Sequence, residues 1–246
     1  MKKSKLWVLL LTILISSACK NAYSVECAGG EIKSKMLPPL DRSEDKPLPP
    51  MNVNGVTFRR TEQIVGGNKV VILHKTDQFF TTSSIQAKSL TNFLVGGGFV
   101  CTDASNPWCA PTALTTFNCH AFALGDRAGL SPQDWLDGEA GPLTDGINPM
   151  GALVSYYLKP YRKSGKTAHE ITRLAGDRCV CEGDVICFLR MDESNRLTFV
   201  HSGKMVKVGS QNWVMSKLGE NPVCTLPLRD LVDEYAPIFS WIELFK

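Results

Sequence analysis

The sequence predicts an α+β domain in which helices come first and an antiparallel sheet follows. Helix-start signals fall at Asn118, Ser131 and Asn148, and the residues after each can place apolar side chains on one helical face. After Gly183 the pattern changes to period two, which is typical of strands that bury one face. Helices and strands that occupy separate stretches of the chain, instead of alternating, favour the α+β class.

The first 24 residues predict an export signal, expected to be cleaved after Ala18 or after Ser24. Lysines precede an apolar run at 6–15, and small residues follow it. The run is too short to span a bilayer as a permanent helix, which takes about 18 residues or more. A lipoprotein interpretation stays open, because Cys19 directly follows the small residues and could carry a lipid. The expected location is the periplasm or cell envelope, with outer-membrane anchoring through Cys19 as the alternative.

Residues 25–52 predict a Pro-rich linker or surface wrap, since prolines at 38–39 and 47–50 favour extended backbone over helix. Residues 53–109 are expected to form a β-rich N-terminal extension. Its clearest element is a hairpin, in which Gly66-Gly67-Asn68 separates short β-like runs. The runs lie at 56–58, 62–65 and 69–73. A short helix is expected over 84–94, before the glycine triplet at 96–98.

Residues 110–246 are expected to form the main domain, and its helices come first. One helix is predicted from near Thr116 to Leu124, with Gly125 as its terminator. The sequence Ser131-Pro132-Gln133-Asp134 is typical of a capped helix start with proline at the first helical position. Asn148-Pro149 predicts another start, with a helix through Tyr157.

Two strands joined by a turn at 192–195 are predicted next, followed by a third strand within 211–217. Alternation assigns side chains to faces of the first two strands. The residues expected to share a face are Val185, Cys187 and Leu189 in the first strand, and Leu197, Phe199 and His201 in the return strand.

Cys119 is the candidate nucleophile, because a thiol at a helix N-terminus faces the positive end of the backbone dipole, which favours thiolate. His201 on a neighbouring strand could take its proton. Ser216 and Asn212 are equal candidates for a third group that orients the histidine. Ser216 has the position along its strand that best matches that of His201, whereas Asn212, nearer the turn, has the side chain that is chemically better suited to the role. His120 points about 100° away from Cys119 on the helix, so it is expected to be structural or substrate-facing.

These residues also have a structural interpretation. Cysteine is among the most buried residue types, and a histidine on an apolar strand face is often a hydrogen-bonded core residue. The order of a cysteine helix, a Gly-Asp turn and a histidine strand favours the catalytic interpretation.

The segments Asn-Cys-His-Ala-Phe at 118–122 and Gly-Asp-Val-Ile-Cys-Phe-Leu-Arg at 183–190 carry a resemblance, together with Leu-Thr-Phe-Val-His-Ser-Gly at 197–203. They resemble the NlpC-type cell-wall peptidases, a papain-like group of cysteine hydrolases that includes the CHAP amidases. The resemblance covers about the last 130 residues. It implies a papain-like fold in which a helix carrying Cys119 packs on an antiparallel sheet carrying His201.

The same resemblance implies an exported thiol hydrolase that cleaves an amide bond, most simply in peptidoglycan peptides, through an acyl-enzyme formed by Cys119 and His201. No cofactor is expected. Two alternatives stay open. One is a catalytically inactive envelope binding or scaffold lipoprotein on the same fold, and the other is a thiol acyltransferase or deamidase.

The balance of charges and the number of cysteines indicate which partners, disulfides and metal sites to expect. The chain has 27 Lys and Arg against 24 Asp and Glu, and removal of three lysines with the signal would balance them, so no nucleic-acid partner is expected. Setting aside Cys119, eight of the nine cysteines can pair. Cys101 and Cys109 bracket a turn-rich loop and form the first predicted bridge. Cys179 and Cys181 are each expected to meet a distant partner. The alternative is a zinc site made by Cys179, Cys181, Cys187 and Cys224, although their spacing matches no common ligand pattern.

Overall fold

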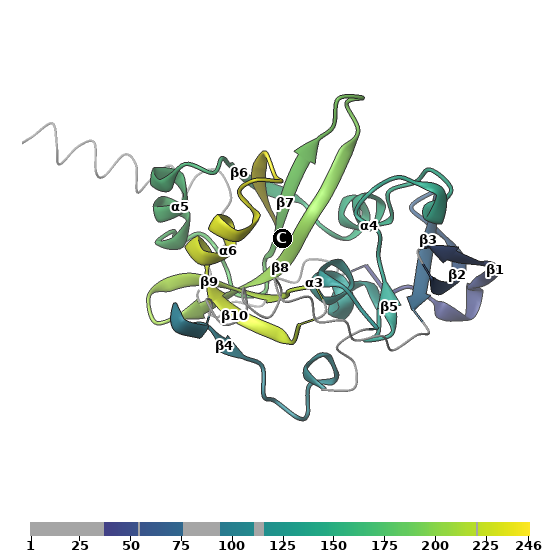
Figure 1. Ribbon diagram of the computed structural model, residues 1–246, viewed down its shortest axis with the longest axis horizontal. Helices are drawn as coiled ribbons and strands as arrows, with labels where there is room; N and C mark the ends of the chain where they lie inside the picture. The colour runs from purple at the N-terminus through teal and green to yellow at the C-terminus, as the bar shows by residue number, and fades with distance from the viewer. Residues whose placement is uncertain (1–36, 54, 76–93, 111–115, 220) are drawn as a thin grey trace, which may run out of the picture.

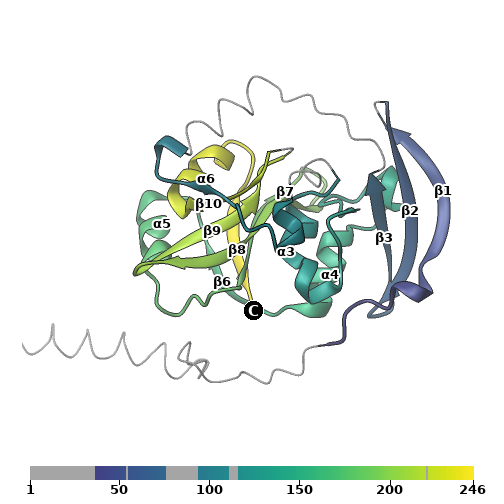
Figure 2. The same ribbon diagram turned by 90° about the horizontal axis from the view of Figure 1, so that it is seen from below.

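The computed structural model describes residues 37–53, 55–75, 94–110, 116–219 and 221–246 and has an α+β fold built on two sheets. All of the strand pairs in both sheets are antiparallel. The smaller sheet has the order β1-β2-β3-β5, and the larger has the order β4-β10-β9-β8-β7-β11-β6. Figure 2 shows the layers: α3 and α4 lie between the two sheets, and α5 and α6 cover the other face of the larger sheet.

The elements have the following bounds. The smaller sheet contains β1 (Lys46–Val53), β2 (Val56–Val65), β3 (Asn68–Lys75) and β5 (Asp134–Trp135). The larger sheet contains β4 (Phe99–Val100), β6 (Pro160–Ser164), β7 (Val185–Met191), β8 (Leu197–Val208), β9 (Gln211–Lys217), β10 (Val223–Pro227) and β11 (Trp241–Phe245). The α-helices are α3 (Cys119–Ala128), α4 (Pro149–Tyr157), α5 (Ala168–Ala175) and α6 (Leu228–Tyr235), and the 3-10 turns are η1 (Arg42–Glu44), η2 (Pro107–Cys109) and η4 (Pro142–Thr144) (Figure 1).

Two main hydrophobic clusters lie on opposite faces of the larger sheet. The first cluster joins α3, α4 and the hairpin to one face, and Phe122 and Leu189 belong to it. The second joins α5 and α6 to the other face, and Phe188 and Leu231 belong to it. Neighbouring residues of β7 therefore pack in different clusters, as the alternation of a strand buried on both faces requires.

The predicted hairpin is confirmed. Strands β2 and β3 pair from Phe58↔Lys75 to Val65↔Asn68, and Gly66 and Gly67 adopt the positive φ angles of a tight turn. The end of the predicted linker departs from expectation, because residues 46–53 pair with β2 as an edge strand. Prolines suit this place, since an edge strand leaves some backbone N–H groups without a ladder partner.

The predicted helix is present as α3, but it begins at Cys119, later than Thr116, and it also ends later than predicted. Gly129, not Gly125, adopts the left-handed conformation (φ 67°) that ends it, and its N–H donates to the Gly125 carbonyl. Gly125 has a packing role instead: a Cβ there would lie 2.1 Å from the Trp108 ring. The predicted helix at 149–157 is confirmed as α4, with the Asn148 side chain accepting from the Gly151 N–H.

No helix starts at Ser131, and that prediction is wrong. The Asp134 carboxylate accepts from both the N–H and the hydroxyl of Ser131, which closes a turn. Asp134 then joins β5, where it lies opposite His74 of β3, and its carboxylate lies 3.0 Å from His74 Nδ1. A cross-strand partner therefore outweighed the local capping signal.

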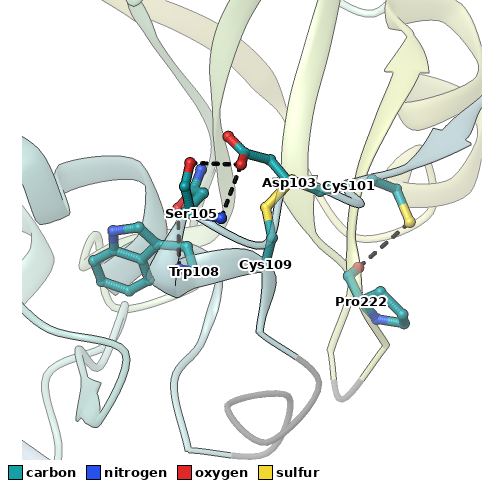
Figure 3. The surroundings of a disulfide bond; sticks show 8 residues. Cys101, Asp103, Ser105, Trp108, Cys109 and Pro222 are labelled. Carbon is teal, nitrogen blue, oxygen red and sulfur yellow. Dashed lines mark hydrogen bonds between the residues drawn. A yellow bond between two sulfur atoms is a disulfide. The ribbon is translucent and has the colours of Figure 1, made fainter.

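The predicted Cys101–Cys109 disulfide is present, with the Cα atoms 5.6 Å apart across the loop that contains η2 (Figure 3). Cys179 and Cys181 each take part in a disulfide. Cys187 and Cys224 are free thiols, so the expectation that both could pair is wrong. They belong to different clusters on opposite faces of the sheet, which keeps them apart.

The export signal at 1–24, Cys19 and nearly all of the predicted 84–94 helix lie outside the described residues. Among the helices of the described ranges, none is long and apolar enough to cross a membrane.

Candidate functional site

Cys119 is the first residue of α3, and Asn118 fixes where that helix begins. The Asn118 side chain accepts from the Ala121 N–H at 3.0 Å and from the Leu136 N–H at 3.3 Å, and it donates to the Leu136 carbonyl. A buried asparagine at the cap position thus ties the first turn to a neighbouring segment. Cys119 itself is a free thiol that keeps partial solvent exposure.

A β-bulge in β8 sets the direction of His201. Leu189 pairs with Phe199 and Phe188 pairs with His201, which leaves Val200 as the extra residue. Phe199 packs in the first cluster, beside α3 and α4, whereas His201 stacks on Tyr235 of α6. The prediction that Phe199 and His201 share a face is therefore wrong, because the bulge shifts the alternation by one residue.

His120 holds the bulge in place. Its Nδ1 lies 2.8 Å from the Ser202 hydroxyl, and its ring also hydrogen-bonds to the Phe199 backbone, so it contacts both sides of Val200. There is no room for a side chain at Gly138, where a Cβ would lie 2.1 Å from the Phe199 carbonyl oxygen and 2.6 Å from His120 Nε2.

Burial lowers the pKa of His120 to about 4, so the ring is neutral at pH 7. Of the two roles expected for His120, the structure supports the structural one.

Ser216 is the residue that orients His201. Its Oγ lies 2.6 Å from His201 Nε2 and also donates to the Ser202 carbonyl at 2.9 Å. A hydroxyl has one proton, so with that proton directed to the carbonyl the oxygen accepts from Nε2–H. This assignment leaves Nδ1 of His201 unprotonated and able to accept a proton.

Asn212, the other candidate, does not reach His201. Its Nδ2 donates to the Leu174 carbonyl at 2.7 Å and to the Asp177 carbonyl at 2.8 Å, and its Oδ1 accepts from Lys207. Asn212 therefore fastens β9 to α5. The four residues that separate it from Ser216 correspond to about 13 Å along a strand, which is too far for both to serve one imidazole.

Burial, and to a smaller extent the charge of His120, lowers the pKa of His201 well below its ordinary value, which makes the neutral form the resting form. Burial also raises the pKa of Cys119 to about 11, despite opposing effects from nearby backbone N–H groups and Lys217. The expectation that the helix N-terminus yields a thiolate is thus wrong for the resting site, since desolvation outweighs the dipole. One of those N–H groups belongs to Ser202, so the sulfur lies against the peptide group that follows His201.

Tyr235 completes the surroundings of His201, and no signal in the sequence indicated it. The two rings stack with centroids 4.1 Å apart and an interplanar angle of 18°. Phe188 contacts His201 from another side at 5.7 Å. Cys119 is one of the groups that raise the pKa of Tyr235, after the larger effect of burial. The amphipathic spacing of 228–235 could have revealed the helix, but not which ring it places on the histidine.

The Gly-Asp turn before β7 has a structural role. Gly183 adopts φ 85°, and its carbonyl accepts from Arg127 of α3 at 3.1 Å. The Asp184 carboxylate accepts from the Tyr161 hydroxyl at 2.6 Å and from the Cys181 N–H at 2.9 Å. The turn thereby fixes the start of β7 relative to α3 and β6.

The zinc alternative has no support in the geometry. Within the described ranges no group of three or more His, Cys, Asp or Glu residues is placed to hold a metal ion. Cys179 and Cys181 are in disulfides, and the other two members of the set lie in separate clusters.

Two surface hollows, of about 480 and 420 Å³, lie away from Cys119 and His201. The first is lined by the N-terminal segment, β2 and α4, and the second by the disulfide loop, α3 and the sheet. Neither hollow is lined by Cys119 or His201, so the candidate site is identified from the contacts of its residues and not from the volume of a hollow.

The structure joins His201 and Ser216 by a hydrogen bond that leaves Nδ1 of a neutral imidazole able to accept a proton. Cys119, a free thiol at a helix start, adjoins this pair through the Ser202 N–H and acts on the pKa of Tyr235, the ring stacked on His201. Such a set can perform nucleophilic chemistry on a carbonyl group. No protein-family model, curated protein sequence or solved structure matches this chain.

Proposed function

We propose that this protein is an exported thiol hydrolase that cleaves an amide bond, with a papain-like fold of the NlpC type. Cys119 is the nucleophile, His201 is the general base and acid, and Ser216 orients the histidine. The observation that carries the proposal is the 2.6 Å contact between Ser216 Oγ and His201 Nε2, because it leaves Nδ1 as the proton acceptor.

The resting state of the proposed site is a neutral pair. With the pKa of Cys119 raised to about 11 and that of His201 lowered, the thiol keeps its proton until a substrate carbonyl is present. Attack of the sulfur on the carbonyl carbon then proceeds as the thiol proton moves to Nδ1 of His201.

Ser216 stabilises the resulting imidazolium by accepting from Nε2–H. The backbone N–H of Cys119, at the helix start, supplies a donor for the oxyanion. The imidazolium next gives its proton to the departing amine, which breaks the carbon–nitrogen bond and leaves a thioester. Water, deprotonated by His201, releases the acyl group and restores the thiol.

The proposed substrate is the peptide portion of peptidoglycan. This choice rests on the resemblance carried by the cysteine, Gly-Asp and histidine segments. Four cysteines, Cys101, Cys109, Cys179 and Cys181, are in disulfides, which is consistent with an oxidising compartment outside the cytoplasm.

Incubation of the mature protein with muropeptides, with products identified by mass spectrometry, tests the proposal. The wild type should release a product and Cys119→Ala should not. Cys224→Ala is a matched control, because it removes another free thiol that lies in the second cluster. Equal product from Cys119→Ala and the wild type would contradict the nucleophile assignment.

A second candidate is an inactive envelope binding or scaffold protein on the same fold, and the raised pKa of Cys119 favours it. In that case the folded wild-type protein cleaves no muropeptide. Transfer of the acyl group to an added amine, in place of water, would instead identify a thiol acyltransferase.

A further inference from the structure

Lys217 is a buried cation at the end of β9, next in sequence to Ser216. Its side chain has no solvent exposure. The ammonium group donates to the backbone carbonyls of Gly219 and Asn221, the latter at 2.7 Å. Burial of an ammonium group is costly even with such partners, so a fully buried lysine is unusual unless its charge has a role.

The direction of the Lys217 side chain connects it to the start of α3. Strand alternation places it on the opposite face of β9 from Ser216, toward the helix that carries Cys119. The ammonium nitrogen lies 5.3 Å from the centroid of the Phe117 ring, and Phe117 is two residues before Cys119. The cation therefore lies near the segment that leads into α3, and its charge has the same sign as the positive end of the helix dipole.

We propose that Lys217 is a positioning residue of this site, whose buried charge stabilises the negative charge that forms on the Cys119 sulfur when the thiol loses its proton. The inference rests on the proposed function for its catalytic consequence, but its effect on the thiol exists without turnover. Lys217 also acts in the expected direction at rest, since it is among the groups that lower the pKa of Cys119. Because Lys217 is fully buried, its charge acts at a lower effective dielectric than in water.

The chain contains a natural comparison for a purely structural lysine. Lys166 donates to the carbonyls of Ala236 and Phe239, both at 3.0 Å, and its nitrogen lies 5.5 Å from the Phe239 ring centroid. Like Lys217, it therefore donates to two backbone carbonyls and lies near a phenyl ring. Lys166 stands before α5, on the far side of the large sheet from α3, so replacing it tests loss of the contacts alone.

The test is the rate at which iodoacetamide alkylates Cys119 at pH 8, followed by peptide mass spectrometry. Lys217→Gln keeps N–H donors for the two carbonyls and removes the charge, and Lys217→Met removes both. Each should slow alkylation of Cys119 about tenfold, which corresponds to about one unit in the thiol pKa. Lys166→Met should stay within about twofold of the wild type, and Lys217→Arg, which keeps the charge, within about threefold.

Circular dichroism and thermal melting establish that each variant is folded. A folded neutral variant that alkylates at the wild-type rate overturns the inference. A tenfold loss of the alkylation rate in Lys217→Arg also overturns the inference. If both neutral variants fail to fold, the rate of Lys217→Arg is the deciding measurement. Slower alkylation without muropeptide cleavage by any form would uphold the role of Lys217 on the thiol and refute the proposed function separately.

Discussion

Replacement of His120 by glutamine should make the stability of the protein less sensitive to mild acid. His120 is buried beside the bulge, with Nδ1 on the Ser202 hydroxyl and a further bond to the Phe199 backbone. Protonation of the ring would turn Nδ1 from an acceptor into a donor toward the Ser202 hydroxyl and would place a positive charge in a buried site. Glutamine offers one donor and one acceptor at every pH of interest, so the variant lacks this proton-linked loss.

The magnitude follows from the pKa of His120, which burial lowers from 6.5 to about 4. A depressed pKa in the folded state means that the unfolded chain binds the proton more tightly. The stabilising contribution is therefore present above pH 6.5 and is lost as the pH falls toward 4. Between pH 7 and pH 5 the linkage relation gives a loss of about 2 kcal/mol from this residue alone.

Urea denaturation at pH 7 and pH 5, followed by circular dichroism, measures this difference. His120→Gln should be less stable than the wild type at pH 7 by about 1–3 kcal/mol, because a buried hydrogen-bond network is disturbed. Its loss of stability between pH 7 and pH 5 should be smaller than that of the wild type by about 2 kcal/mol. His169→Gln serves as the control, since it makes the same replacement at an exposed position on α5, away from the bulge. Identical pH dependence in the wild type and His120→Gln would refute the reasoning.

Three further predictions concern the residues around His201. Ser216→Ala should lower amide hydrolysis about tenfold to a hundredfold, since it leaves Nε2 of a buried imidazole without its acceptor; unchanged steady-state kinetics would remove Ser216 from the site. Gly138→Ala should destabilise the fold by about 1–3 kcal/mol or more, because the new Cβ would lie 2.1 Å from the Phe199 carbonyl oxygen, and an unaltered denaturation midpoint would contradict this. Alkylation of Cys119 should accelerate about tenfold per pH unit from pH 7 to 9 without a plateau, as its pKa is raised to about 11; a plateau below pH 8 would show that a thiolate exists at rest.

Local signals predicted the elements whose geometry depends on nearby residues. The start of the helix at Cys119 follows from the asparagine cap, and the start of α4 follows from Asn148-Pro149. Turn residues predicted the β2–β3 hairpin, and a turn-rich loop predicted the Cys101–Cys109 disulfide. In each case the forces that form the element act over a few residues, so the sequence pattern carries the information.

Other local signals were outweighed by contacts with distant segments. Asp134 satisfies its carboxylate with Ser131 and with His74 from another strand, so the capping signal does not produce a helix. The Pro-rich stretch at 46–53 gains a strand partner in β2. The helices α5 and α6 were not predicted, although each has an apolar stripe that packs in the second cluster.

The sequence by itself determined which residues could carry the chemistry: Cys119 at a helix start, His201 in a strand, and Ser216 or Asn212 in the next strand. Tertiary structure decided how they are directed. The bulge at Val200 turns His201 toward α6, and only the register of β8 and β9 selects Ser216 over Asn212. The bulge and the register are fixed by hydrogen bonds between segments far apart in the chain, such as the bond between His120 and Ser202. Contacts of this kind form only when the chain folds, so a local sequence pattern does not predict them.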